Sequence, residues 1–387
     1  MKTVLKNGVL LDAMHEYEPG DILIEDDRIE AVGGDFAGLD AEVIDLAGMT
    51  VMPAFADAHV HVKGMPGKPT DEMLKALAYN GVSAVKDLGI LDHMETEPYL
   101  AWLRQQRVPG KARVATAGRY IDVANGYGMG PMPELMWGIE IKTPEEAAEA
   151  VRAQFLAGVD GIKIGLNDGG MGPILGKLSP EHVAAITRAA REVGIWTTAH
   201  VYTVPDLHML IENGIGEAAH TPHDAEMDDE LIGRMVEEGI SMTSTIGLLE
   251  ASDPLPERYP PVYASAQEFV DVMLRNKEVT IRNLAKFYKN GGTINLGTDL
   301  MHYVDPIRDA AIPVGELALL RNAVGMSMKD TIRAGTIHAA RSCGFADEGM
   351  LRPGNKASVI AFRGTLSDSF AELRSLEFVM NQGLRLR

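Results

Sequence analysis

Residues 55–64, FADAHVHVKG, place two histidines one residue apart directly after an apolar run. Successive side chains of a β-strand point to opposite faces, so His59 and His61 are predicted to project from one face, about 6–7 Å apart. Two neutral imidazoles on one face are a suitable pair of metal ligands. So short a pattern recurs by chance, and the rest of the chain has to decide between a metal site and ordinary packing.

The bulk composition limits the class of protein. A chain of 387 residues suggests two or three domains, or one large α/β barrel with an appendage. No stretch approaches the roughly 18 uninterrupted apolar residues of a membrane helix, and the N-terminal residues do not resemble a signal peptide. The single cysteine, Cys343, excludes an internal disulfide and is interpreted as a buried apolar residue. We therefore expect a cytoplasmic enzyme or binding protein.

The formal net charge of −19 indicates what kind of partner the protein has. So acidic a chain repels polyanions, which argues against nucleic acid or an anionic membrane surface as the main partner. We expect a small-molecule substrate. The oligomeric state is left open, and a homo-oligomer is compatible with the sequence.

Short alternating strands are predicted at both ends of the chain, within residues 1–52 and 349–387. Between them, apolar or β-rich segments alternate with helical patterns such as residues 143–157 and 179–193. Several of these segments begin with a glycine directly after a helical pattern, as a C-terminal helix cap would. The eight expected strands lie within residues 50–59, 81–87, 112–118, 158–164, 194–200, 214–220, 239–245 and 292–299.

Eight strands with intervening helices predict an α/β protein whose residues 53–348 form a (β/α)₈ TIM barrel. The terminal segments, residues 1–52 and 349–387, are expected to pair with each other as one small β-sandwich. Prolines crowd the irregular stretch within residues 246–265, which excludes a regular helix or central strand there. We interpret it as a loop over the barrel mouth or as a surface excursion without a function.

Polar residues recur at the expected carboxyl ends of these strands. In a barrel, such ends converge on one mouth, so residues far apart in the sequence become neighbours. Four histidines, one lysine and one aspartate are thereby predicted to form a cluster. In strand order, the strand-end residues are His59, His61, Asp87, Arg119, Lys163, His200, His220, Thr245 and Asp299.

This arrangement resembles the amidohydrolase superfamily over essentially the whole chain. The motifs that carry the resemblance are DAHVH, GIKIG, TTAHVYT, EAAHTPH and LGTD, followed by TIHAARSCGF and GMLRPGNKASVIAF. No single motif is specific, but their order and placement are. The resemblance is closest to the branch of Xaa-Pro dipeptidases and related acyl-amino-acid hydrolases, with imidazolonepropionase nearby.

The resemblance implies a binuclear metal centre. In this superfamily a lysine on the fourth strand reacts with CO₂ to give a carbamate that bridges two metals, and Lys163 holds that place. The mixed nitrogen and oxygen ligands suit Zn²⁺ best, although Mn²⁺, Co²⁺ and Fe²⁺ are also compatible. By resemblance, one ion is held by His59, His61 and Asp299, and the other by His200 and His220.

The expected reaction is hydrolysis of an amide bond in a small molecule such as an N-acyl amino acid, a dipeptide or a cyclic amide. A hydroxide that bridges the two cations attacks the carbonyl, and Asp299 carries the proton to the leaving nitrogen. A lactone or another ester is the alternative substrate.

Other readings are weaker. Deaminases of the superfamily carry a glutamate three residues beyond the fifth-strand histidine, where this chain has Thr203, and they lack the lysine. A non-catalytic relative would have lost ligands that this chain keeps. The stretch MGPILGKL is no P-loop, because Met171 and Leu178 replace the required glycine and Ser/Thr.

Substrate contacts are predicted in three segments. Tyr202, two residues beyond His200, points back toward the mouth and either binds the substrate or packs. The stretch NGYG departs from the GGHG-like loop of the dipeptidases, which puts specificity for proline dipeptides in doubt. The other substrate candidates are Arg119, Tyr120, Tyr127, His223 and His302, whereas His15, His93, His182, His208 and His338 are interpreted as ordinary or structural.

Overall fold

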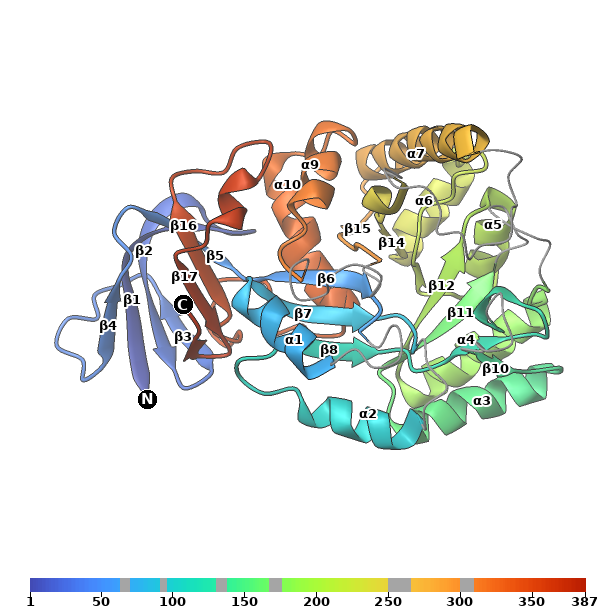
Figure 1. Ribbon diagram of the computed structural model, residues 1–387, viewed down its shortest axis with the longest axis horizontal. Coiled ribbons are helices and arrows are strands. Elements are labelled where there is room, and N and C mark those ends of the chain that lie inside the picture. Colours follow the sequence, from blue (N-terminus) through green and yellow to red (C-terminus); the bar gives the residue numbers. More distant parts are fainter. Residues whose placement is uncertain (63–69, 91–95, 130–137, 167–175, 250–265, 300–309) are drawn as a thin grey trace.

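The computed structural model describes residues 1–62, 70–90, 96–129, 138–166, 176–249, 266–299 and 310–387. Strands from both ends of the chain form one sheet at one side of the molecule, blue and red in Figure 1. The remaining strands belong to a parallel α/β unit that carries its helices on the outside (Figure 1). The chain therefore has the mixed α/β architecture that the sequence predicts.

The terminal sheet has eight strands in the order β18-β17-β16-β5-β1-β2-β3, with β4 also paired to β1. Strand β5 joins the two ends of the chain, because it pairs antiparallel with β16 and sets Met52 opposite Ile360. The predicted pairing of the terminal segments is confirmed, whereas their packing as a sandwich of two sheets stays a prediction. The bounds are β1 (Lys2–Leu11), β2 (Glu16–Glu25), β3 (Arg28–Val32), β4 (Glu42–Asp45), β5 (Met49–Pro53), β16 (Val359–Arg363), β17 (Phe378–Asn381) and β18 (Leu384–Arg385).

All eight strands predicted for the central region are present. Two short strands that the sequence did not indicate, β9 (Tyr120–Asp122) and β10 (Gly138–Glu140), follow the third one. The predicted strands are β6 (Phe55–Val60), β7 (Val82–Asp87), β8 (Arg113–Thr116), β11 (Gly161–Leu166), β12 (Trp196–Val201), β13 (Glu217–Ala218), β14 (Ser241–Thr243) and β15 (Ile294–Asn295).

The central strands form two parallel sheets, one of three strands (β6-β7-β8) and one of seven (β10-β9-β11-β12-β13-β14-β15). Backbone hydrogen bonds link the two sheets at both edges of the three-stranded one. At one edge the Ala58 amide donates to the Leu296 carbonyl, and at the other the Asp160 amide donates to the Thr116 carbonyl, each over 2.9 Å. The sheets therefore curl toward each other, although among the described residues no continuous ladder of strand pairs closes them.

Local chemistry explains where the helices begin and end. The hydroxyl of Thr143 accepts a hydrogen bond from the third backbone amide of α3, and Gly158 ends that helix with a positive φ of 107°. Ser179 and Gly194 do the same for α4. The helices are α1 (Thr70–Tyr79), α2 (Thr96–Gln105), α3 (Pro144–Ala157), α4 (Pro180–Val193), α5 (Val204–Glu212), α6 (Asp229–Glu238), α7 (Ala266–Lys289), α9 (Val314–Asn322), α10 (Met328–Arg333) and α11 (Ala339–Ser342).

Charged groups occupy the space enclosed by the parallel strands. Lys86 of β7 donates to Glu217 of β13 over 2.8 Å, and the two side chains are only 1% and 6% exposed. Glu217 also accepts hydrogen bonds from Asn295 and Ser342. Branched apolar residues usually fill such interiors, so this buried ion pair is a distinctive feature of the chain.

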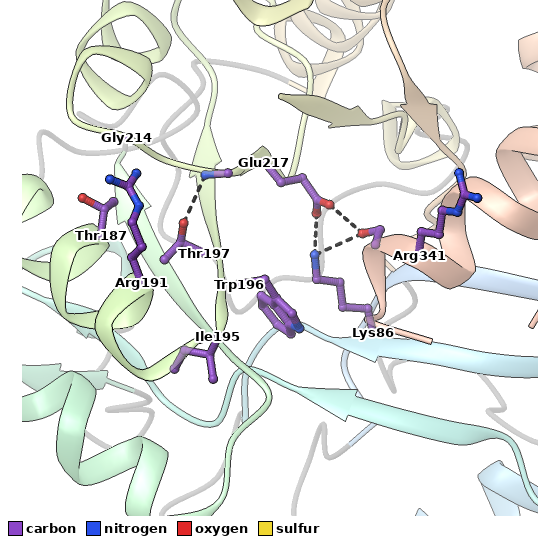
Figure 2. Close-up of a pocket in the computed structure, with 12 residues that line it drawn as sticks. Lys86, Thr187, Arg191, Ile195, Trp196, Thr197, Gly214, Glu217 and Arg341 are labelled. Carbon is purple, nitrogen blue, oxygen red and sulfur yellow. Dashed lines mark hydrogen bonds and ion pairs between the residues drawn. The ribbon is translucent and has the colours of Figure 1, made fainter. Parts of the chain in front are cut away.

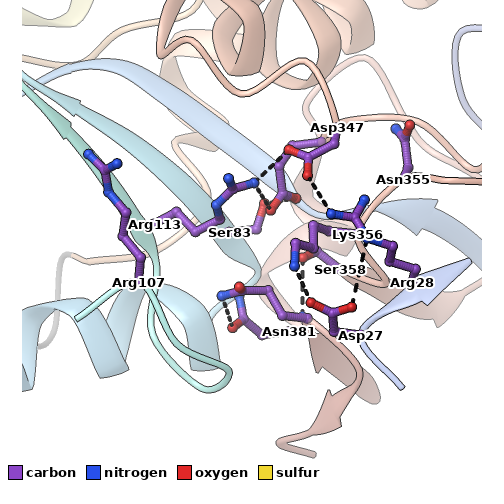
Figure 3. A network of polar contacts seen from close by, with 12 residues as sticks. Asp27, Arg28, Ser83, Arg107, Arg113, Asp347, Asn355, Lys356, Ser358 and Asn381 are labelled. Carbon is purple, nitrogen blue, oxygen red and sulfur yellow. Dashed lines mark hydrogen bonds and ion pairs between the residues drawn. The ribbon is translucent and has the colours of Figure 1, made fainter. Parts of the chain in front are cut away.

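A polar network connects the terminal sheet to the parallel strands (Figure 3). Asp347 accepts hydrogen bonds from Arg113 of β8 over 2.8 Å and from Arg28 of β3 over 3.3 Å. The neighbouring Glu348 is buried and accepts from Ser83 of β7 over 3.2 Å. These contacts hold the sheet formed by the two chain ends against β7 and β8.

Two further predictions from the sequence concern the proline-rich loop and membrane-spanning helices. Residues 246–249 form a short 3₁₀ helix, while the rest of the predicted loop, residues 250–265, lies outside the described residues. Among the helices described, none is both long and apolar enough to cross a membrane.

Candidate functional site

His59 is the last residue but one of β6 and His61 directly follows the strand, and both are buried. The Nδ1 atom of His59 lies 3.0 Å from the carbonyl oxygen of Ala219, and that of His61 lies 3.0 Å from the carbonyl oxygen of Gly89. Since a carbonyl oxygen can only accept, each Nδ1 carries a proton, and in the neutral ring each Nε2 then presents a lone pair. The two imidazoles are thereby oriented as metal ligands.

Asp299 meets both of these lone pairs. Its Oδ1 atom lies 3.3 Å from Nε2 of His59 and 3.1 Å from Nε2 of His61. Its backbone is held in place because its amide donates to the carbonyl of His59 over 2.7 Å. Asp299 has a φ of 54°, a strained value for a non-glycine residue. Three acceptor atoms from two strand ends therefore converge, an arrangement that a bound cation would satisfy.

His220 and His200 complete the imidazole cluster. The rings of His59 and His220 have centroids 4.6 Å apart, and those of His200 and His220 are 4.7 Å apart. The Nδ1 atom of His220 lies 3.0 Å from the hydroxyl oxygen of Thr245, which follows β14. The ligand atoms of His59, His220 and Asp299 all lie within 4.8 Å of one another, close enough to share one metal ion.

The pKa values of these groups follow from burial and from their neighbours. Burial lowers the pKa of His220 to about 3 and holds that of His200 well below its usual range, so both rings are neutral at pH 7. Burial also favours a neutral His61, but its contact with Asp299 outweighs this and raises the pKa of His61. Burial raises the pKa of Asp299, yet the surrounding imidazoles bring it well below the ordinary value. The cluster therefore combines the neutral imidazoles of His200 and His220 with an ionised carboxylate and with His61, whose charged form Asp299 favours.

Lys163 projects from β11 into the same region and is fully buried. Within the described part of the chain, its Nζ atom has no hydrogen-bond partner. Burial lowers the pKa of Lys163 to about 7, against the opposing attraction of Asp299. An amine without a partner, uncharged in a substantial fraction of molecules at neutral pH, is unusual in a protein interior and indicates a chemical role.

Aromatic side chains surround the imidazoles. Tyr127 stacks on His200, and Tyr202 lies 4.3 Å from His200 and 4.5 Å from His223, measured between ring centroids. The ring of Tyr120 lies 5.8 Å from Nζ of Lys163. The structure thus brings four of the predicted substrate residues to the cluster.

For the other two substrate candidates, Arg119 and His302, contact with the substrate stays a prediction. The backbone of Arg119 is held by Gln154 of α3, which accepts from its amide and donates to its carbonyl. His302 lies outside the described residues, as does His93.

Two buried aspartates, Asp57 and Asp122, support the site, although the sequence pattern predicts a role for neither. Asp57 accepts hydrogen bonds from the His59 amide and the Thr298 hydroxyl, which ties β6 to the segment before Asp299. Asp122 accepts from the Gly128 amide over 2.8 Å and so holds the loop that carries Tyr127. Burial raises the pKa of each carboxyl to about 7. The position of Asp57 as the first residue of the DAHVH motif is the only feature of the sequence that could have indicated its role.

The cysteine and the described histidines outside the site have structural surroundings, as the sequence predicts. Cys343 is 1% exposed, and burial raises the pKa of its thiol. Each described histidine outside the site contacts a nearby polar group: His15 contacts Asp12, His182 contacts Ser179, His208 contacts Asp228, and His338 contacts the carbonyl of Ile294.

Comparison with known proteins agrees with this geometry. The sequence pattern of the amidohydrolase family matches residues 50–383. A dihydroorotase from Syntrophotalea carbinolica is 33% identical over 144 residues, which are 35% of this chain and 33% of that protein. The match therefore spans only about a third of the length of that relative.

Solved structures match over the whole chain. A Xaa-Pro dipeptidase with bound methionine has a TM-score of 0.82 at 20% identity, with 100% of this chain and 99% of the other covered. An ochratoxinase from A. niger has a TM-score of 0.80 at 19% identity, with 100% and 95% covered. At these identities the likeness shows a shared fold.

Proposed function

This chain belongs to the amidohydrolase family, and on that premise we propose that it is a metal-dependent hydrolase that cleaves an amide C–N bond of a small molecule. One observation carries the proposal. The ligand atoms of His59, His220 and Asp299 lie within 4.8 Å of one another, and the buried amine of Lys163 acts electrostatically on the same histidines. Distant strand ends have no packing reason to bring such polar groups together.

We propose that the site binds two divalent ions, with zinc as the first candidate. His59, His61 and Asp299 would hold one ion, and His200 and His220 the other. Lys163 would bridge them after reacting with CO₂, which turns a cationic side chain into an anionic oxygen ligand. The residues fit these roles, because Nζ of Lys163 is buried without a hydrogen-bond partner in the described chain and the Nε2 atoms of His59 and His61 face Asp299.

The bound ions would acidify a water molecule and polarise the scissile carbonyl. Asp299 would then accept the proton of the attacking water at its carboxylate and deliver it to the leaving nitrogen, so that the amine departs neutral. The hydroxyl of Tyr202 would donate a hydrogen bond to the carbonyl oxygen. Tyr202 is suited to this because it is 6% exposed and its ring lies 5.3 Å from that of His220.

The substrate is proposed to be an N-acyl amino acid, a dipeptide or a cyclic amide. The names of the relatives, dihydroorotase and Xaa-Pro dipeptidase, support the last two. Tyr120, Tyr127 and His223 would contact the substrate from the aromatic surroundings, with Arg119 and His302 as further candidates. A lactone or another ester is the alternative, because the same attack opens any activated carbonyl.

We further propose that residues 53–348 form a closed (β/α)₈ barrel, with residues 1–52 and 349–387 as one β-sandwich domain. The hydrogen bonds between Ala58 and Leu296 and between Asp160 and Thr116 support closure at the two edges. The shared apolar cluster of Ile22, Val51 and Phe378 supports a separate terminal domain.

The experiment pairs metal analysis with a substrate screen. Purified protein is expected to contain about two transition-metal ions per chain and to hydrolyse at least one compound from a set of N-acyl amino acids, dipeptides, lactams and lactones. Asp299→Asn should abolish turnover, whereas Asp40→Asn, a matched exposed carboxylate, should not. Active protein without stoichiometric metal would refute the proposal. Full activity of Asp299→Asn would remove the proton carrier.

A further inference from the structure

A hollow lies at the opposite ends of the strands from the imidazole cluster. Trp196 and Glu217, the first residues of β12 and β13, line it together with the end of α4. On β12, Trp196 precedes His200 by four residues, which separates the two ends by roughly 13 Å. The cavity measures about 400 Å³, enough for a small organic molecule.

The charge of this hollow contrasts with that of the chain. Three cationic side chains line it, Lys86, Arg191 and Arg341, against one carboxylate, that of Glu217. Figure 2 shows Glu217 engaged by Lys86, with which it forms the buried ion pair of the interior. The hollow therefore carries a net charge of about +2 in a protein whose net charge is −19.

The two arginines are the uncompensated charges. Arg191 lies in the last turn of α4 and Arg341 in α11, and both side chains are exposed. Neither guanidinium forms an ion pair with any residue that the structure describes, whereas Arg113 and Arg321 each pair with an aspartate. In Figure 2 the two arginines extend on either side of Trp196.

The indole ring of Trp196 forms a rigid, partly apolar wall of the hollow between Arg191 and Arg341. Its ring packs against the backbone of Gly161, where an added Cβ atom would lie 2.0 Å from the indole. The ammonium of Lys86 lies 4.1 Å from the centre of the ring and holds it from another side. Ile195 extends the apolar surface beside it.

We infer that this hollow is a binding site for a small organic anion that carries carboxylate or phosphate groups on an apolar body. The planar guanidinium groups of Arg191 and Arg341 would bind the oxyanion groups in a bidentate manner, and the body would lie against Trp196. The site is distinct from the imidazole cluster. The inference goes beyond the proposed function and holds whether or not hydrolysis is observed.

The test titrates the full-length protein with succinate and, separately, with glycerol 3-phosphate, followed by tryptophan fluorescence and by calorimetry. At least one of the two is expected to bind saturably, and the one that binds more tightly distinguishes carboxylate from phosphate recognition. The Arg191→Gln/Arg341→Gln variant should raise the dissociation constant at least about tenfold. Sodium chloride at about 0.5 M should also weaken binding.

A matched variant separates a specific site from general charge. Arg234→Gln/Arg282→Gln also removes two positive charges, but from surface ion pairs outside the hollow. This variant should bind the anion as the wild type does. The inference is overturned if neither compound binds up to about 10 mM, if the pocket variant binds as well as the wild type, or if the matched variant loses as much affinity. Unchanged circular dichroism shows that each variant is folded.

Discussion

The ring of Tyr127 lies flat on the imidazole of His200, with centroids 3.7 Å apart and planes inclined by 16°. Tyr127 reaches this position because Gly165 of β11 has no side chain, since an added Cβ there would lie 3.1 Å from Cβ of Tyr127. The loop before it is anchored by Asp122. Tyr127 therefore fixes the orientation of His200 from one face.

Replacement of Tyr127 tests this contact. In Tyr127→Ala the ring of His200 loses its support, and an aromatic pair contributes about 0.5–1.5 kcal/mol, so metal affinity should fall by up to about tenfold. Tyr127→Phe keeps the stacked ring and should bind metal as the wild type does. Chelator competition measures both affinities. Equal affinity in all three proteins would show that the stacking does not orient the histidine.

Lys163→Ala should lose activity at least about a hundredfold, because the proposed bridging ligand disappears and metal content falls with it. The buried space left behind should admit a short carboxylic acid, so formate or propionate is expected to restore part of the metal content and activity. Elemental analysis and turnover are measured with and without the acid. Wild-type activity in Lys163→Ala would exclude the carbamate bridge.

Thr245→Val removes the hydroxyl that lies 3.0 Å from Nδ1 of His220 while keeping the shape of the side chain. A lost partner of a metal-ligating histidine typically costs 10- to 100-fold in metal affinity or activity, and we expect that range here. Thr245→Ser keeps the hydroxyl and is the matched control. The prediction is wrong if valine and serine at this position behave alike.

The buried pair of Lys86 and Glu217 is expected to couple strongly. Glu217→Gln leaves a buried ammonium without its counter-charge, which should lower the free energy of unfolding by about 3–5 kcal/mol. Lys86→Met/Glu217→Gln removes both charges and should cost less than the single change. Urea unfolding of the wild type, Lys86→Met, Glu217→Gln and the double variant closes the cycle, and additive effects would argue against the pairing.

The buried Glu348 predicts a pH dependence of stability. Burial raises the pKa of this carboxyl from 4.5 to about 7, although Arg113 and Ser83 act in the opposite direction. Because the folded state then binds the proton more tightly than the unfolded state, this group stabilises the fold fully below pH 4.5. The contribution is lost as the pH rises toward about 7.

Glu348→Gln, which is uncharged at every pH, should reduce the loss of stability between pH 5 and 7 by on the order of 1–3 kcal/mol. Urea unfolding of the wild type and the variant at both pH values measures the difference. Glu238→Gln, at an exposed position, should leave the pH dependence unchanged. The same slope in Glu348→Gln as in the wild type would refute the assignment.

Local chemistry in the sequence determined most of the architecture. Gly158 and Gly194 end their helices because glycine adopts a positive φ without strain, and Thr143 and Ser179 begin them by accepting backbone amides. Such signals place the eight strands and the helices between them. They also place the metal-binding candidates, since parallel strands bring their carboxyl ends to one side.

Only the tertiary structure decided which groups support these residues. The carbonyls of Ala219 and Gly89 fix the proton on Nδ1 of His59 and His61. Because every residue carries a backbone carbonyl, the sequence does not indicate which ones accept these hydrogen bonds. The stacking of Tyr127 on His200 depends on the space that Gly165 leaves, a contact between segments far apart in the chain. Periodicity and capping act over a few residues, whereas these contacts form only when distant segments fold together.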